Sequence, residues 1–196
     1  MVFACGAANG GLPAGYATRM GMLQPDETYR IAYVVRSDPL ALSDLEDPEL
    51  LAVHRYWDTV REGRVGPPVG RFRLEELPPA VIPAVAVVDF LGPPLDYYYR
   101  FFGTRMVEIA GQDLTGKRYF ADDVTGYGFV NAQIFPKMIE RRQPVLTRTE
   151  WVAVNGREIT TVTVRLPLSE DGEAVTGGVT ANRYYRGHDG NGEILN

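Results

Sequence analysis

Two tight turns near the C-terminus constrain the fold more than any other feature of the sequence. Asn155-Gly156 and Glu170-Asp171-Gly172 are strong β-hairpin signals, because Asn-Gly and Asp-Gly readily adopt the left-handed backbone that a short turn needs. They separate three segments rich in β-branched residues, which we expect to be strands: residues 145–154, 158–168 and 173–185. Strands joined by such short turns run antiparallel. The C-terminal part of the chain therefore predicts an antiparallel sheet.

A second hairpin is predicted in the middle of the chain. Residues 84–91 form an apolar run, residues 96–102 are rich in aromatic side chains, and Gly92-Pro93-Pro94 separates the two as a turn. With the three C-terminal segments this makes five strands. Residues 28–36 give a weak strand signal, with Ile31, Tyr33 and Val35 alternating, and are not counted among the five.

Two amphipathic helices accompany these strands. Residues 43–61 predict a helix, because Asp47-Pro48 is a typical start signal and apolar residues then recur at helical spacing. Residues 129–142 also carry apolar side chains three and four positions apart, and Pro136 predicts a kink or break there.

The predicted fold class is α+β. The simplest packing is a five-stranded antiparallel sheet with short helices on one face, preceded by the amphipathic helix. We assign residues 43–186 to this domain. Residues 1–42 are expected to be a largely disordered or weakly structured N-terminal extension, and residues 187–196 a C-terminal tail.

Composition excludes several classes of protein. The chain has 20 Lys and Arg against 25 Asp and Glu, a net charge of −5, which argues against a nucleic-acid binder. The single cysteine, Cys5, cannot form an internal disulfide. No apolar run reaches the roughly 20 residues that span a bilayer. We therefore expect a cytoplasmic protein that contacts neither nucleic acid nor membrane.

Three blocks of sequence resemble a known family. Tyr99-Arg100-Phe101-Phe102-Gly103-Thr104 is followed by Gly111-Gln112-Asp113-Leu114-Thr115-Gly116-Lys117, and later by Arg165-Leu166-Pro167-Leu168-Ser169 with Asp171-Gly172 after it. In this order they resemble signatures of bacterial PAS-like domains of the PAS_5 type. The resemblance extends over about residues 50–185.

This resemblance implies a PAS fold with a small apolar cavity, and a role in sensing and signal transduction. We expect a stand-alone sensory domain that binds a small molecule, dimerises, or does both. Few residues follow the last strand, so we expect it to signal through a separate partner protein. Two alternatives stay open: a ligand-free protein–protein interaction module, and a small cone-shaped enzyme with Glu108 or Tyr99 as acid or base.

Candidate functional residues follow from strand and helix periodicity. Tyr97, Tyr99 and Phe101 share a strand face by simple alternation and are expected to line the cavity, together with Met106, Phe129, Ile134 and Trp151. The apolar stripe of the first helix is the candidate homodimer interface, with Val53, Trp57 and Val60.

The sequence does not identify a cofactor. His54 and His188 are poorly placed to bind haem, and Cys5 lies too early in the chain for a flavin–cysteine adduct. Noncovalent flavin or another planar aromatic molecule stays open. Asp122-Asp123 has no third ligand at a suitable spacing, so no metal site is expected.

Overall fold

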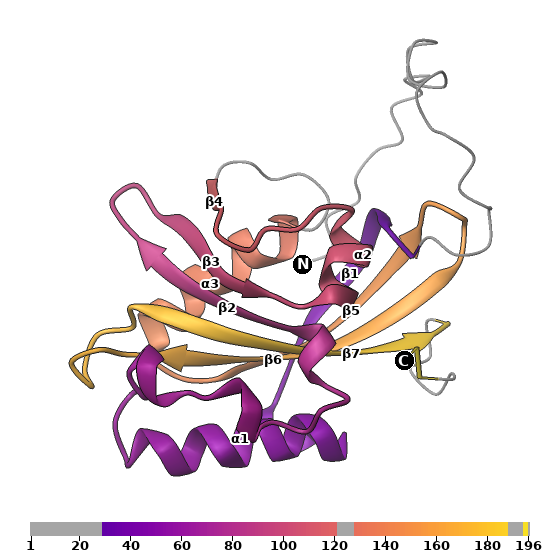
Figure 1. Ribbon diagram of the computed structural model, residues 1–196. Coiled ribbons are helices and arrows are strands. Elements are labelled where there is room, and N and C mark those ends of the chain that lie inside the picture. Colours follow the sequence, from indigo (N-terminus) through magenta and orange to yellow (C-terminus); the bar gives the residue numbers. More distant parts are fainter. Residues whose placement is uncertain (1–28, 121–127, 188–193, 196) are drawn as a thin grey trace.

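The computed structural model describes residues 29–120, 128–187 and 194–195. Within these residues the chain forms one antiparallel sheet of seven strands with three α-helices (Figure 1). The strands are β1 (Ile31–Leu40), β2 (Val85–Leu91), β3 (Asp96–Phe102), β4 (Arg118–Phe120), β5 (Val145–Ala153), β6 (Glu158–Leu168) and β7 (Gly177–Arg186). The helices are α1 (Pro48–Arg61), α2 (Thr104–Ala110) and α3 (Gly128–Arg141). The predicted α+β class is confirmed.

The number of strands differs from the prediction. The order across the sheet is β1-β5-β6-β7-β2-β3-β4, so the five predicted strands are contiguous and β1 and β4 extend the sheet at its edges. The prediction of a five-stranded sheet is therefore wrong by these two strands. β4 has only three residues, and β1 is mostly exposed and shifts register twice against β5, so neither shows a clear alternating pattern.

Strand β1 also changes where the folded unit begins. It pairs with β5 from Ile31 opposite Ala153 to Leu40 opposite Leu146. Residues 31–40 therefore belong to the sheet, although the sequence placed the start of the domain at residue 43. In the predicted tail, Ile194 forms a bridge to Tyr185. The rest of the predicted extension, residues 1–28, lies outside the described residues.

Helix α1 starts at Pro48, directly after the predicted cap Asp47 and five residues later than the predicted range of 43–61. The carboxylate of Asp47 accepts hydrogen bonds from the backbone N–H groups of Glu49 (3.0 Å) and Leu50 (2.9 Å), which stabilises the first turn. The other carboxylate oxygen accepts from Arg183 (3.2 Å) and Tyr185 (2.9 Å) on β7. Asp47 thus caps the helix and also attaches it to the sheet.

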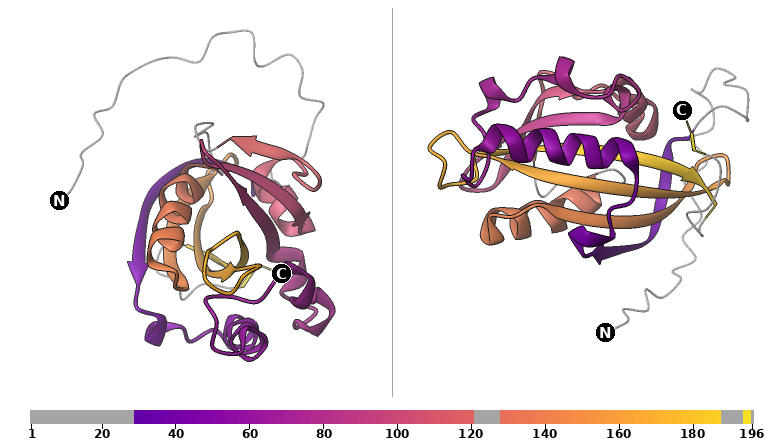
Figure 2. Two further views of the ribbon diagram at one scale, coloured as in Figure 1. Left: turned by 90° about the vertical axis from the view of Figure 1, so that its left-hand side faces the viewer. Right: turned by 90° about the horizontal axis from the view of Figure 1, so that it is seen from below.

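The sheet has two faces of different chemistry, because side chains alternate along β6 and β7. One face, which we call the outer face, packs against α1 and is apolar there, with Val164, Leu166, Leu168, Val179 and Ala181. The opposite or inner face is polar at the intervening positions, with Thr161, Thr163, Arg165, Thr180 and Asn182. In the end-on view the sheet is curled, with α3 on its concave side and α1 on its convex side (Figure 2, left).

Helices α2 and α3 cover the inner face. Met106 of α2 and Phe135 and Met138 of α3 are buried with the aromatic side chains of β3. A Cβ atom at Gly178 of β7 would lie 2.9 Å from the terminal methyl group of Met138, so a glycine there permits the close approach of α3. Pro136 lies inside α3 and is exposed, and the helix continues past it to Arg141 instead of breaking.

Candidate functional site

A small cavity lies on the inner face, between the sheet and helices α2 and α3. Its volume is about 40 Å³. One part of its lining is polar and comes from α3 and the central strands: Asn131, Thr149, Thr161, Thr163, Arg165 and Asn182. The other part is apolar and includes Ile109 and Trp151. We call this the Arg165 cavity.

Arg165 is the only arginine among the residues that line this cavity, and its side chain is 4% exposed. Its Nε and Nη2 donate to Oδ1 of Asn131 on α3 at 3.2 and 3.0 Å, and its Nη1 donates to the hydroxyl of Thr147 on β5 at 2.8 Å. The guanidinium therefore bridges the helix and the sheet.

Hydrogen bonds orient the neighbouring polar groups. The Thr163 hydroxyl donates to Oδ1 of Asn182 (2.8 Å), and Nδ2 of Asn182 donates to the backbone oxygen of Ala84 (2.8 Å). On β5, the Trp151 indole donates to the Thr161 hydroxyl oxygen at 2.7 Å. The hydroxyl proton of Thr161 can therefore be donated to another acceptor.

One hydroxyl on the same face has no partner among the described residues. Thr180 lies opposite Arg165 in the β6–β7 ladder, is 2% exposed, and its Oγ1 makes no hydrogen bond there. An unpaired buried hydroxyl lowers stability by about 1–3 kcal/mol. The inner face therefore contains polar groups that packing alone does not explain.

One of the predicted lining residues lines the cavity, and the structure disperses the others. Trp151 lines the cavity, and Ile134 is buried on α3, the helix that supplies Asn131. Tyr97, Tyr99 and Met106 are almost fully buried, but in a cluster with Phe135 and Met138, where they serve packing. Phe129 is 44% exposed.

Tyr97 illustrates this packing role. Its ring lies 5.3 Å from that of Phe135 and 6.0 Å from that of Phe90, and its hydroxyl has no hydrogen-bond partner within the described residues. Burial, and to a smaller extent the charge of Asp96, raises the pKa of Tyr97 to about 12. The phenol stays neutral at any physiological pH.

Phe101 does not share a face with Tyr97 and Tyr99. Tyr99 pairs with Val88, and Phe101 pairs with the adjacent Val87, so the ladder has a β-bulge at Arg100. Beyond the bulge, Phe101 packs against the outer core below α1. A prediction from simple alternation places Phe101 on the wrong face, because it assumes that β3 contains no extra residue.

The predicted dimer residues lie inside the protomer. Val53 and Trp57 are 0% and 2% exposed, and Val60 packs beside them against the sheet. The Trp57 indole donates to the backbone oxygen of Pro167 at 2.7 Å. The apolar side chains of α1 therefore pack against the sheet of the same chain, and Val53 and Trp57 are not available on its surface.

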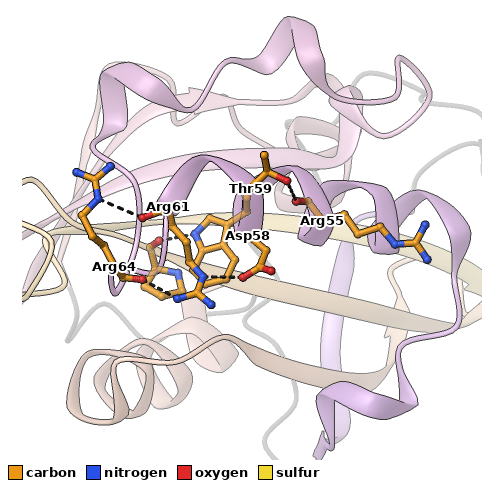
Figure 3. Close-up of polar contacts among 7 residues, drawn as sticks. Arg55, Asp58, Thr59, Arg61 and Arg64 are labelled. Atoms are coloured by element: carbon orange, nitrogen blue, oxygen red, sulfur yellow. Dashed lines mark hydrogen bonds and ion pairs between the residues drawn. The ribbon is translucent and has the colours of Figure 1, made fainter.

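The C-terminal turn of α1 closes the outer core (Figure 3). The Arg61 guanidinium lies 5.0 Å from the centre of the Trp57 ring, and its Nε donates to Asp58 at 2.7 Å. Its Nη1 donates to the backbone oxygen of Arg64 at 2.8 Å. A surface cleft of about 610 Å³ borders these residues. These contacts hold the Arg61 guanidinium against the Trp57 ring.

The Arg165 cavity is small, and the other residues considered for cofactor binding or acid–base chemistry do not line it. Haem and flavin do not fit a cavity of about 40 Å³, since pockets for ligands of drug size measure about 300–1,000 Å³. His54, whose pKa is lowered mainly by burial, lies on α1 beside Trp57 and does not line the cavity. Glu108 pairs with Arg105 at 2.6 Å. Cys5, Asp122-Asp123 and His188 lie outside the described residues.

No group of three or more His, Cys, Asp or Glu side chains in the described part of the chain is placed to hold a metal ion. No helix in the same residues has both the length and the apolar character that crossing a membrane requires.

Comparison with known proteins finds no protein-family model, curated protein or solved structure that matches the chain. The resemblance to PAS-like domains therefore rests on the three sequence blocks alone. The functional argument rests on the geometry of the Arg165 cavity.

Sequence reasoning missed the polar half of this site. Arg165 was noted only as part of a resemblance block, and Asn131, Thr163 and Asn182 were not noted as candidates. A signal was present: Thr163 and Arg165 alternate with apolar residues on a strand that lies between two other strands. Polar residues that alternate with apolar ones are normally predicted to face solvent, but here α3 covers them.

Proposed function

We propose that this protein is a sensory domain that binds a small molecule in the Arg165 cavity and transmits the change to a separate partner protein. One observation carries the proposal: a buried arginine lines a small, partly open cavity together with further buried polar side chains. A domain selected only for stability would fill this position with apolar side chains, because burying polar groups costs free energy. The curled antiparallel sheet with helices on its concave face is compatible with the PAS-like resemblance, although it has seven strands where the resemblance implies five.

The path for signalling starts at the same residues. Arg165 connects the cavity to α3 through Asn131, and Asn182 connects it to the segment before β2 through Ala84. A ligand that changes either hydrogen bond changes the position of a covering element relative to the sheet. A partner that contacts α3 would detect this change.

Native mass spectrometry of the freshly purified full-length chain tests the proposal. We expect an added mass of a small molecule that disappears on denaturation, and a melting temperature that rises when the molecule is added back to stripped protein. A bare mass, together with no shift of the melting temperature across a library of small metabolites, would contradict the proposal.

A ligand-free interaction module is the second candidate, and one observation favours it. β1 is an edge strand that carries two exposed large apolar side chains, Tyr33 (58% exposed) and Val35 (50% exposed). Edge strands with apolar side chains tend to pair with another chain. In this case we expect a homodimer through β1, and not through α1.

Size-exclusion chromatography with light scattering separates the two candidates. If the protein is a dimer of this kind, Tyr33→Lys makes it a monomer, and Phe129→Lys, at another exposed aromatic residue, does not. A wild-type monomer at high concentration would remove the support for this second candidate.

A further inference from the structure

Strand β7 is paired along its whole length on one side and along only half of it on the other. Toward β6 its pairing runs from Gly177 to Arg186. Toward β2 it runs only from Gly177 to Ala181, because β2 begins at Val85. No other strand of the described residues lies beside residues 182–186 on this side, and we call these residues the open half of β7. Such strand edges bind extended segments through their backbone groups.

Two residues of the chain itself occupy part of the open half. Ile194 forms an antiparallel bridge with Tyr185, and the backbone N–H of Leu195 donates to the backbone oxygen of Tyr184 at 2.9 Å. Leu195 also packs against a cluster of buried side chains that includes Ile109 and Tyr184, whereas Ile194 is 38% exposed. Figure 1 shows this segment beside the end of β7. The open half therefore accepts an extended segment that directs an apolar side chain inward.

The site continues beyond these two residues. A cleft of about 570 Å³ borders the open half, and Leu195, Asn182 and Arg183 are all part of its lining. A strand that continued the antiparallel register past Leu195 would lie opposite Arg183 and then Asn182, and would reach the start of β2. Ile194 and Leu195 thus fill only one end of a longer strand position.

The charged side chains of the cleft are paired with one another. Arg105 pairs with Glu108 at 2.6 Å, and Arg183 pairs with Glu49 at 2.8 Å. These two positive and two negative groups leave the lining without net charge. The cleft therefore favours an uncharged extended segment, recognised through its backbone and an apolar side chain, over an acidic or basic one.

We propose that the open half of β7 is a strand-addition site for an extended apolar segment of a partner protein, and that residues 194–195 occupy it when the partner is absent. The partner's segment runs antiparallel to β7, places one apolar side chain where Leu195 lies, and fills the rest of the cleft. The chain's own residues compete with it. This inference goes beyond the proposed ligand-binding function and does not depend on it.

Fluorescence polarisation with the full-length protein and a labelled peptide tests the proposal. The probe has the sequence of residues 190–196. A control peptide carries proline in place of the leucine, so it cannot donate the hydrogen bond that Tyr184 accepts. We expect the probe to bind weakly to the wild type and the control peptide not to bind.

A change in the chain's own segment tests the competition. Leu195→Pro removes the N–H that bonds to Tyr184 and should release the segment, so the probe should bind about 10-fold more tightly than to the wild type. If Leu195→Pro does not fold, Leu195→Asp gives the same test, because a carboxylate does not pack against the apolar cluster.

A substitution in the lining connects this binding to the cleft. Ala80 is exposed and lines the cleft, so Ala80→Trp places an indole there and should abolish binding of the probe to the Leu195→Pro protein. Gln133→Trp is the matched control, since Gln133 is exposed on α3 and does not line the cleft. It should leave the affinity for the probe unchanged.

Equal affinity of the wild type and Leu195→Pro, no binding to either, or binding that Ala80→Trp leaves unchanged would overturn the proposal. A wild-type dimer that Leu195→Pro turns into a monomer in light scattering would overturn it too, because the occupant would then be the segment of a second copy.

The proposed function fails separately from this inference. A copurified ligand without peptide binding would overturn the strand-addition site alone. Peptide binding by a protein that has a bare mass and no shift of its melting temperature would overturn the ligand-binding function alone.

Discussion

Strands β6 and β7 present opposite chemistry on their two faces. Toward α1, Leu166 and Val179 belong to a continuous apolar core, and Trp57 is buried over them. Toward α3, the alternate residues Arg165 and Thr180 are just as buried but polar. Both faces are inside the protein, so burial does not explain the difference. The outer face has the composition expected of a core that serves stability, and the inner face keeps buried polar groups, which is the feature behind the proposed ligand site.

The largest expected change in stability comes from substituting two buried tryptophans, one on each face of the sheet. Trp57 and Trp151 each donate an indole hydrogen bond, one on each face. Trp57→Ala should lower the free energy of unfolding by about 3–5 kcal/mol, because it opens a void in an apolar core and leaves the Pro167 carbonyl unpaired. Trp151→Ala should cost less, since Trp151 already borders a cavity with polar walls that water can enter.

Urea denaturation followed by circular dichroism measures both values. Trp57→Phe is the control for the outer face and should keep most of the stability. If Trp151→Ala costs as much as Trp57→Ala, the inner face is packed like an ordinary core and the contrast fails.

A pair of threonines on the inner face sharpens the comparison further. Thr180→Val replaces a hydroxyl that has no partner among the described residues by a methyl group of the same shape, and should raise the free energy of unfolding by about 1 kcal/mol. Thr147→Val removes the acceptor of Arg165 Nη1 and should lower it by about 1–3 kcal/mol. Differential scanning calorimetry shows whether each variant is more or less stable than the wild type. Destabilisation by Thr180→Val would show that its hydroxyl has a partner.

The smallest effect concerns two phenols, one on each face. Burial is the main cause that raises the pKa of both Tyr97 and Tyr185 to about 12, and the second cause is the charge of Asp96 or Asp47. Because the folded state holds these protons more tightly than the unfolded chain, their contribution to stability is complete below pH 10. It is lost as the pH rises from about 10 to 12.

Absorbance at 295 nm and unfolding at several alkaline pH values test this prediction. Tyr97→Phe and Tyr185→Phe should each make stability less dependent on pH above 10. At pH 7, Tyr185→Phe should cost more than Tyr97→Phe, since only the Tyr185 hydroxyl has a partner within the described residues, Asp47 at 2.9 Å. Ionisation of both phenols at their ordinary pKa would contradict the burial that the structure assigns to them.

Local signals allowed a large part of the fold to be predicted. Asp47 caps α1 as expected, and Gly156 and Gly172 adopt the positive φ angles of 80° and 85° that their hairpin turns require. These features depend on a few neighbouring residues. Strands β1 and β4 could not be predicted in the same way, because their stability comes from pairing with partners distant in the sequence.

The site was less predictable than the fold, for a related physical reason. Strand periodicity shows which residues share a face, such as Thr163 and Arg165, but it does not show what covers that face. Only the position of α3 makes these polar residues internal. The aromatic residues that seemed suited to a ligand, Tyr97 and Tyr99, instead fill the space between β3 and the helices.

The bulge at Arg100 has a consequence for how this sheet tolerates change. Tyr99 contributes to the core under α2 and α3, and Phe101, two positions later, to the core under α1, only because one extra residue stands between them. Substituting Arg100 alters one exposed side chain, and deleting it would remove the bulge while leaving Phe101 opposite Val87 and Phe102 opposite Ala86. The residue at position 100 can therefore be lost without moving an aromatic side chain from one core to the other.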